Sequence, residues 1–168
     1  ILQRLPATME LALTALFMSI LIGIPAGVYA GLKPESWLSR SIMSGSILGF
    51  SLPNFWIGLM LILLFAVQLK LFPASGRGET VSLFGIPVSF LTWDGLRHLF
   101  LPSLTLSLYK AALVVRLARA GTREVVSQDY IRFARAKGLS QSRIVLVHVL
   151  KNMMIPVVTV LGLEFGSM

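Results

Sequence analysis

The sequence predicts an all-α fold: a polytopic bundle of transmembrane helices with one polar elbow before its last span. Hydrophobic residues make up 55% of the 168 residues and charged residues only 13%, with a mean hydropathy of +0.81. Soluble domains carry about 25% charged residues. The apolar residues form long blocks, and each complete block reaches the ~20 residues needed to cross a bilayer. The chain is therefore expected to be a single transmembrane domain over residues 1–168.

The net charge of +8 does not by itself indicate nucleic acid binding. The positive residues cluster beside the apolar blocks and form no basic face with interleaved aromatic residues. They therefore indicate topology signals and contact with membrane lipid rather than nucleic acid binding. The sequence contains no cysteine and no glycine-rich phosphate loop ending in Gly-Lys-Ser/Thr, which excludes thiolate metal sites and ATP binding by that route.

The first apolar block covers residues 8–30. Thr8 is placed to cap its helix, and Glu10 is expected in the first turn, near the positive end of the helix dipole. Glycines within the first two blocks are expected to permit close helix packing, because glycine is costly inside a helix. These glycines are Gly23, Gly27, Gly45, Gly49 and Gly58.

The second block covers residues 42–69, and Pro53 near its middle predicts a kink or a broken helix. Asn54 beside this proline can line a translocation pathway or make an interhelical hydrogen bond, and both interpretations stay open. The third block covers residues 99–118. The fourth begins near 153 and reaches 168 as an incomplete span, so the chain is expected to be a piece of a longer protein.

The distribution of lysine and arginine predicts the orientation. Eight such residues lie from Arg116 to Lys151, whereas only three lie from Lys70 to Arg97. The positive-inside rule therefore places the connection 119–151 in the cytoplasm and the loop 70–97 outside. Within the outer loop, the segment SLFGIPVSFL indicates a short hairpin.

The cytoplasmic connection contains a helix–glycine–helix elbow. Asp129 is expected to be the N-cap of a short helix over residues 130–137, and Gly138 fits the left-handed position that ends a helix. Leu139 can then fold back on this helix, while Ser140 caps the next one. The spacing places one set of side chains on a common face: Tyr130, Phe133 and Ala134.

The charge of the elbow fits two interpretations equally well. Arg132, Arg135 and Lys137 are suited to anionic lipid headgroups at a membrane surface. They are equally suited to a docking site for a soluble partner protein. The residue pattern alone leaves both interpretations open.

The segments DYIRFARAKGLS and HVLKNMMIPVVTVLG resemble the cytoplasmic loop of binding-protein-dependent ABC importer permeases. Within that group, the chain is similar to the dipeptide, oligopeptide and nickel branch, and in particular to its B-type subunit. The blocks LPATMELALTALFMSILIGIPAGV, SLPNFWIGLMLILLF, LFPASGRG and HLFLPSLTLSLYKAALVVRLARA resemble the same family in the same order. Where many importers have Glu-Ala-Ala, this chain has Arg132, Phe133 and Ala134.

The resemblance implies a type I ABC importer permease at the cell inner membrane, transporting dipeptides or oligopeptides handed over by an extracytoplasmic solute-binding protein. The implied partners are a second homologous permease subunit, two ATP-binding subunits that hydrolyse ATP, and that binding protein. Arg77 and Glu79 of the outer loop are then expected to contact the binding protein. The elbow would act as a coupling helix on the ATPase through Tyr130, Arg132, Phe133, Ala134, Arg135, Ala136, Lys137, Gly138, Leu139 and Ser140.

Alternative functions remain within and outside this family. Close relatives of such permeases also import nickel or glutathione. A stand-alone secondary carrier or channel would need ion-coupling groups within its spans, and Glu164 is the main candidate for such a group or for lining a translocation path. A membrane enzyme is disfavoured because Asp94, His98 and His148 are isolated in the sequence, so no catalytic site, metal site or cofactor is expected.

Overall fold

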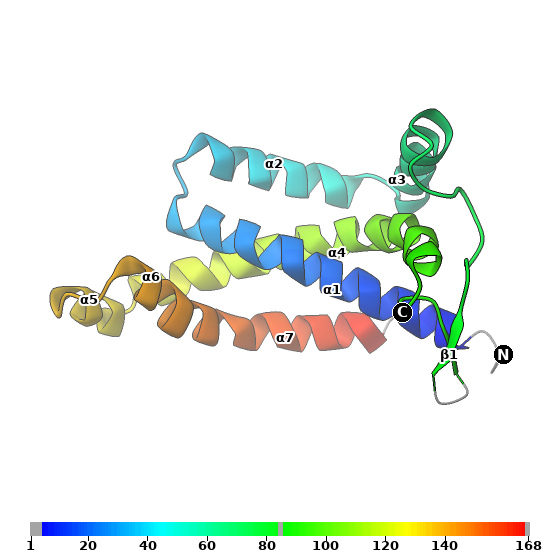
Figure 1. Cartoon of the computed structure of the whole chain (residues 1–168). Coiled ribbons are helices and arrows are strands. Elements are labelled where there is room, and N and C mark those ends of the chain that lie inside the picture. Colours follow the sequence, from blue (N-terminus) through cyan, green and yellow to red (C-terminus); the bar gives the residue numbers. More distant parts are fainter. Residues whose placement is uncertain (1–4, 84–85, 167–168) are drawn as a thin grey trace. The chain divides into compact units, whose positions relative to one another are not determined.

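The computed structural model describes the backbone of residues 5–83 and 86–166, and does not extend to the side chains of residues 83–86 and 164–166. Most of the described chain is helical. The helices are α1 (Leu5–Leu32), α2 (Trp37–Ser51), α3 (Asn54–Leu61), α4 (Trp93–Ser127), α5 (Asp129–Ala136), α6 (Gln141–Arg143) and α7 (Leu150–Gly166), with π-helical segments η1 (Ile62–Gln68) and η2 (Ile144–Val149) (Figure 1).

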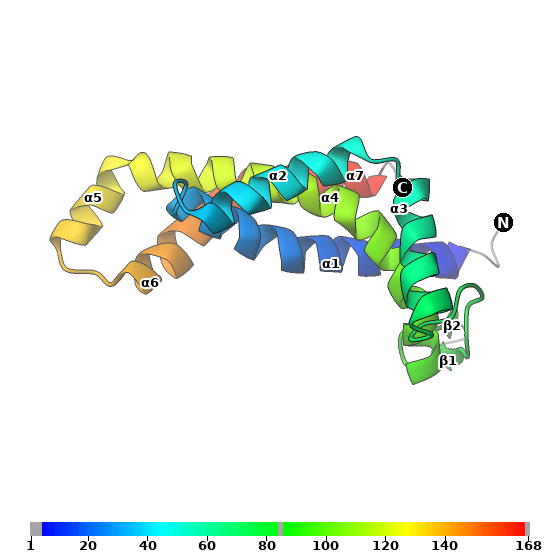
Figure 2. The ribbon, with the colours of Figure 1, turned by 90° about the horizontal axis from the view of Figure 1, so that it is seen from above.

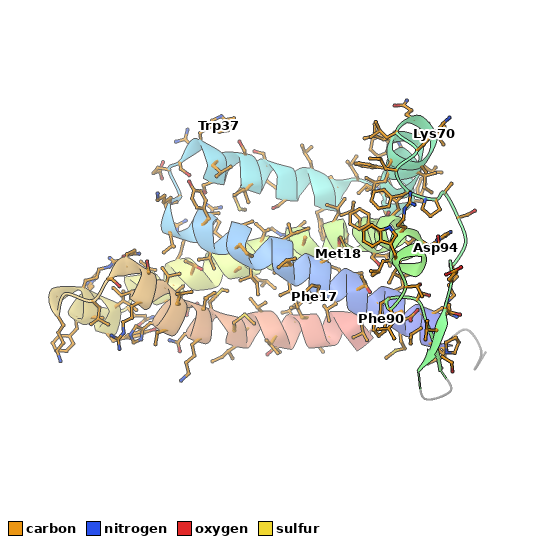
Figure 3. All side chains as sticks on the ribbon, in the orientation of Figure 1. Phe17, Met18, Trp37, Lys70, Phe90 and Asp94 are labelled. Atoms are coloured by element: carbon orange, nitrogen blue, oxygen red, sulfur yellow. The ribbon has the colours of Figure 1, made fainter. Side chains whose placement is uncertain are left out.

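The structure contains helices of the length and composition of membrane spans. Among the described residues, three helices are long and apolar enough to cross a bilayer, namely Leu5–Leu32, Trp93–Ser127 and Gln141–Leu163. Large apolar side chains point outward from them, as Phe17 does at 63% exposure (Figure 3). Such exposure is unfavourable in water but suits a helix surrounded by lipid.

The second block is broken at Pro53, as the sequence predicts. The helices on its two sides, α2 and the run from Asn54 to Gln68, are bent by 107°. Pro53 adopts an extended conformation with φ −63° and ψ 135°. Its carbonyl accepts hydrogen bonds from the backbone N–H groups of Trp56 and Ile57, which starts the next helix.

The third and fourth spans are longer than the apolar blocks that predict them. Helix α4 starts at Trp93 because the Thr92 hydroxyl caps it, accepting a hydrogen bond from the Gly95 N–H at 3.0 Å. It then continues through Ser127, well beyond the apolar block 99–118. The last span starts at Gln141 rather than near 153, because α6, η2 and α7 follow one another without a break.

The predicted start of the first helix is wrong. Leu5 is already helical, so Thr8 is not the N-cap, and Glu10 lies beyond the first turn. The carboxylate of Glu10 is instead 7% exposed and bound to groups of the outer loop. Its role is therefore a long-range contact rather than an interaction with the helix dipole.

The chain divides into two compact units. The first combines the segments 1–19 and 51–110, and the second combines 20–50 and 111–168. Helices α1 and α4 are therefore each divided between the two units, with one part in each. The hairpin belongs to the first unit and the elbow to the second.

In the second unit, a ladder of α1 glycines packs against α4. A Cβ atom built on each glycine would lie 2.5–2.6 Å from a side-chain atom of α4. The pairs are Gly23 with Val114, Gly27 with Ala118, and Gly31 with Thr122. Close packing is thus confirmed at Gly23 and Gly27, whereas Gly45 has no atom within 4 Å of such a Cβ.

In the first unit, the outer loop contains the predicted hairpin. Strands β1 (Val81–Leu83) and β2 (Ile86–Val88) pair antiparallel, with Val81 opposite Val88 (Figure 2). A two-stranded hairpin is marginal in isolation. Its contacts with α1 and α4 therefore decide whether it is held in place.

Candidate functional site

The elbow turns through a Schellman motif. Gly138 has φ +79°, the left-handed conformation that the sequence predicts for it. Its N–H donates to the Arg135 carbonyl at 2.9 Å, and the Leu139 N–H donates to the Ala134 carbonyl at 3.2 Å. These two bonds satisfy carbonyls that the end of α5 would otherwise leave without a partner.

The start of α5 differs by one residue from the prediction. Gln128 is the N-cap, in an extended conformation and without a side-chain cap bond, so Asp129 is the first helical residue. The carboxylate of Asp129 lies 3.4 Å from the Arg132 guanidinium, and both side chains are largely exposed. A surface pair of this kind contributes little stability.

The second arm begins as the sequence predicts. The Ser140 hydroxyl caps α6, accepting a hydrogen bond from the Arg143 N–H at 3.4 Å. Figure 2 shows α5 and α6 as the two arms of the elbow, joined by a turn. Both arms are therefore set by local hydrogen bonds at their own ends.

The buried face of α5 is aliphatic. Ile131 and Ala134 are 0% and 8% exposed, whereas Tyr130 and Phe133 are 44% and 61% exposed. Ile144 of η2 is also fully buried. The interior of the elbow is therefore aliphatic, and the aromatic side chains are available on its outside.

Tyr130 connects α5 with α7 at the surface. The Asn152 side-chain amide donates to the Tyr130 hydroxyl at 3.1 Å and to the His148 carbonyl at 2.8 Å. The Tyr130 and His148 rings lie 6.3 Å apart. The sequence did not predict that these three residues meet, because the one feature they share in it is a polar side chain on a short amphipathic segment.

The outside of the elbow forms a surface that is both basic and apolar, which we call the elbow surface. The Lys137 ammonium lies 4.6 Å from the centre of the Phe133 ring. A Cβ atom on Gly138 would meet nothing within 4 Å. The elbow surface consists of exposed residues: Arg132, Phe133, Arg135, Ala136, Lys137, Gly138 and Ser140.

The two predicted pathway residues are not part of the elbow surface. Asn54 is exposed and is the first residue of α3. The side chain of Glu164 lies outside the described residues. A pathway role for either residue therefore stays a prediction.

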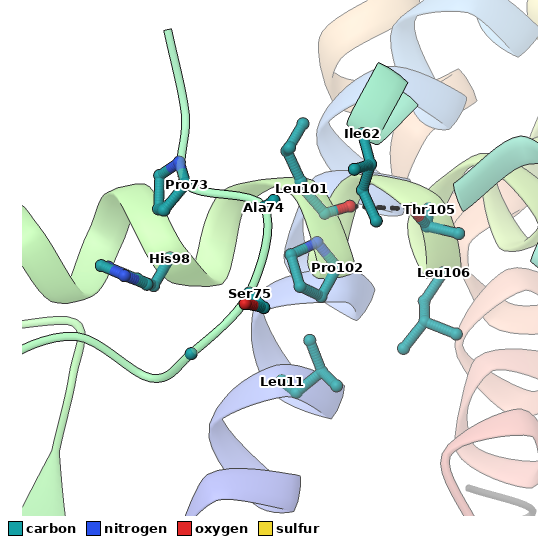
Figure 4. A pocket seen from close by; sticks show the side chains of 11 residues that line it. Leu11, Ile62, Pro73, Ala74, Ser75, His98, Leu101, Pro102, Thr105 and Leu106 are labelled. Atoms are coloured by element: carbon teal, nitrogen blue, oxygen red, sulfur yellow. Dashed lines mark hydrogen bonds between the residues drawn. The ribbon is translucent and has the colours of Figure 1, made fainter. Parts of the chain in front are cut away.

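The first unit contains a mostly apolar cavity of about 400 Å³ (Figure 4). One polar group in its wall is already engaged, since the Thr105 hydroxyl donates to the Leu101 carbonyl at 2.8 Å. His98 Nδ1 lies 2.9 Å from the Asp94 carbonyl. In the part of the chain that is described, no group of three or more acidic, histidine or cysteine residues is placed to hold a metal.

The long apolar helices and the exposed basic elbow define a polytopic helical membrane protein. The family of the binding-protein-dependent transport system inner membrane component matches residues 23–168, and the chain belongs to this family. The family resemblance predicted from the sequence is thereby confirmed.

Three relatives illustrate the similarity. The dipeptide transport system permease protein DppB of Haemophilus influenzae is 43% identical, over 94% of this chain and 51% of the relative. The di/tripeptide transport system permease protein DppB of Pseudomonas aeruginosa is 41% identical, over 97% and 52%. The peptide transport system permease protein SapB of Salmonella typhimurium is 39% identical, over 97% and 56%. The chain thus spans about half the length of the relatives it matches.

Proposed function

We propose that this chain is part of the permease subunit of an ATP-driven importer for small peptides. Membership of the family and the peptide-transport names of three relatives support this substrate class. The permease itself would perform no chemistry. ATP would be hydrolysed by two separate subunits, and peptides would arrive on an extracytoplasmic solute-binding protein, with a second permease subunit completing the pathway.

The elbow surface would transmit work from an ATPase subunit. The observation that carries this role is Phe133, a large aromatic side chain 61% exposed on a rigidly turned helix and surrounded by basic residues. Exposed aromatic residues of this kind become buried anchors when a partner protein binds, whereas charges at the rim of the interface steer association. The excess of positive charge in the elbow connection supports a cytoplasmic location, where ATP is available.

The outer loop would face the solute-binding protein on the opposite side of the membrane. Few basic residues lie in this loop, which supports the outward orientation. Apolar side chains of the loop are exposed, including Val81 and Phe90, each at 46%. Arg77 and Glu79 stay proposed contacts of this loop.

Substitutions at Gly138 test the coupling role. For alanine and leucine, adopting the left-handed conformation costs about 1–2 kcal/mol. Neither Cβ would meet any atom of the chain within 4 Å, so both variants should retain the elbow to a similar extent. Leucine, however, extends a larger side chain into the space where the ATPase would dock. Asparagine tolerates the left-handed conformation and serves as the conformational control.

The assay is peptide uptake and peptide-stimulated ATP hydrolysis by the complete transporter in proteoliposomes. Gly138→Leu should reduce uptake about tenfold relative to Gly138→Ala, a difference of about 1.4 kcal/mol, while ATP hydrolysis continues without transport. Gly138→Asn should also reduce uptake, because its side chain is similar in size to leucine while the left-handed conformation costs it little. Equal uptake by the leucine and alanine variants at equal expression would exclude docking at the elbow surface.

A further inference from the structure

Glu10 is a buried carboxylate that coupling at the elbow does not use. It lies near the start of α1, a helix apolar enough to span the membrane, and is only 7% exposed. One of its oxygens, Oε1, accepts a hydrogen bond from the Ser89 N–H at 2.6 Å. The other, Oε2, accepts one from the Arg77 guanidinium at 3.2 Å. Both oxygens thus bind groups of the outer loop.

Arg77 extends this attachment to the hairpin. The same guanidinium nitrogen that binds Glu10 also donates to the Pro87 carbonyl at 2.8 Å. Pro87 lies in β2, and Ser89 follows directly after that strand. One carboxylate therefore holds two points of the outer loop on either side of the hairpin. Charge-assisted hydrogen bonds of this kind are stronger than neutral ones, and more so when buried.

A second attachment ties the loop to the start of α4. The Asp94 carboxylate accepts a hydrogen bond from the Glu79 N–H at 3.0 Å, and the Thr92 hydroxyl donates to the Glu79 carbonyl at 2.7 Å. Gly78, with φ +73°, lies so close to this helix that a Cβ atom would be 2.7 Å from His98 Nδ1. The loop backbone is therefore held from two helices before any partner arrives.

We propose that Glu10 is a positioning residue that presets the outer loop for docking of the solute-binding protein. This inference rests on the proposed import function. A loop already held in its binding conformation loses less conformational freedom on association, which strengthens binding. The attachment also leaves apolar side chains of the loop exposed, as Figure 3 shows for Phe90.

The test uses the full-length permease in its assembled transporter and the solute-binding protein of the same system, labelled with a fluorophore. Glu10→Gln preserves the shape of the side chain and an acceptor for Ser89, but places an amide N–H₂ against Arg77. Arg77→Lys retains the positive charge but replaces the planar guanidinium, one nitrogen of which binds both Glu10 and Pro87. The matched control is Glu35→Gln, since Glu35 is paired with Arg40 at 3.3 Å on the exposed surface.

Two quantities are measured: hydrogen exchange at the Ser89 amide and neighbouring hairpin amides, and the affinity of the binding protein. Both Glu10→Gln and Arg77→Lys should accelerate exchange and weaken binding by about tenfold, with little change in thermal stability. Glu35→Gln should change neither quantity. The double variant Glu10→Gln, Arg77→Lys should bind less weakly than the two single effects multiplied, because both changes break the same attachment.

Each other outcome overturns a specific part of the inference. Unchanged exchange in Glu10→Gln would show that Glu10 does not hold the loop. Faster exchange with unchanged affinity would reduce Glu10 to a purely structural residue. If the wild-type transporter bound no solute-binding protein, the proposed function and the docking role would both fail, while the exchange data would still decide whether Glu10 holds the hairpin.

Discussion

Replacement of Gly27 by alanine gives a sharp test of the packing between α1 and α4. A Cβ atom on Gly27 would lie 2.5 Å from the Ala118 Cβ and 2.6 Å from the Val115 carbonyl oxygen. Non-bonded carbon atoms prefer separations of about 3.5–4.0 Å. The two helices must therefore move apart locally by about 1 Å, because neither contact atom belongs to a flexible side-chain end.

The expected change in unfolding free energy follows from two opposing effects. Overpacking of this kind destabilises by about 1–3 kcal/mol. Alanine has a higher helix propensity than glycine by about 1 kcal/mol, which offsets part of that loss. Gly45→Ala is the matched control, because a Cβ there meets no atom within 4 Å and only the propensity gain applies. The two variants should therefore differ in unfolding free energy by about 1–3 kcal/mol.

The assay is reversible unfolding of the full-length protein in mixed micelles of a mild detergent and sodium dodecyl sulfate, followed by fluorescence or circular dichroism. Gly27→Ala should unfold at a lower fraction of sodium dodecyl sulfate than wild type, and Gly45→Ala at an equal or higher fraction. If Gly27→Ala proved as stable as Gly45→Ala, the close contact between α1 and α4 would not exist in the folded protein.

Two further predictions concern the elbow and the outer loop. Ile131→Ala should destabilise the protein by about 2–5 kcal/mol, because Ile131 is fully buried. Phe133→Ala, at an exposed position, should leave the thermal midpoint of unfolding unchanged and lower transport. A loss of stability in Phe133→Ala would place that side chain in the interior. Gly95→Ala should release the outer loop, since its Cβ would collide with the Ser89 carbonyl and approach the Glu79 carbonyl to 2.8 Å; limited proteolysis of the hairpin would detect this, and an unchanged cleavage rate would contradict it.

The elbow shows which features can be read from neighbouring residues. Gly138 and Ser140 were predicted correctly because the bonds they serve close within a few residues, at the end of α5 and the start of α6. The break at Pro53 was predictable for the same reason, since proline lacks the N–H that a continuing helix requires. The buried face of α5 was not, because the burial of Ile131 requires a second element packed against it.

From the sequence alone, the class of protein and the turn of its elbow could be predicted, because hydropathy, charge and turn chemistry act over a few neighbouring residues or through long uniform blocks. The role of Glu10 follows only from the packed fold, since its partners Arg77 and Ser89 lie 67 and 79 residues further along the chain. The same fold also determines which glycines pack closely, placing Gly27 against α4 and leaving Gly45 open. Contacts of this kind depend on how distant segments meet, and no local pattern encodes that arrangement.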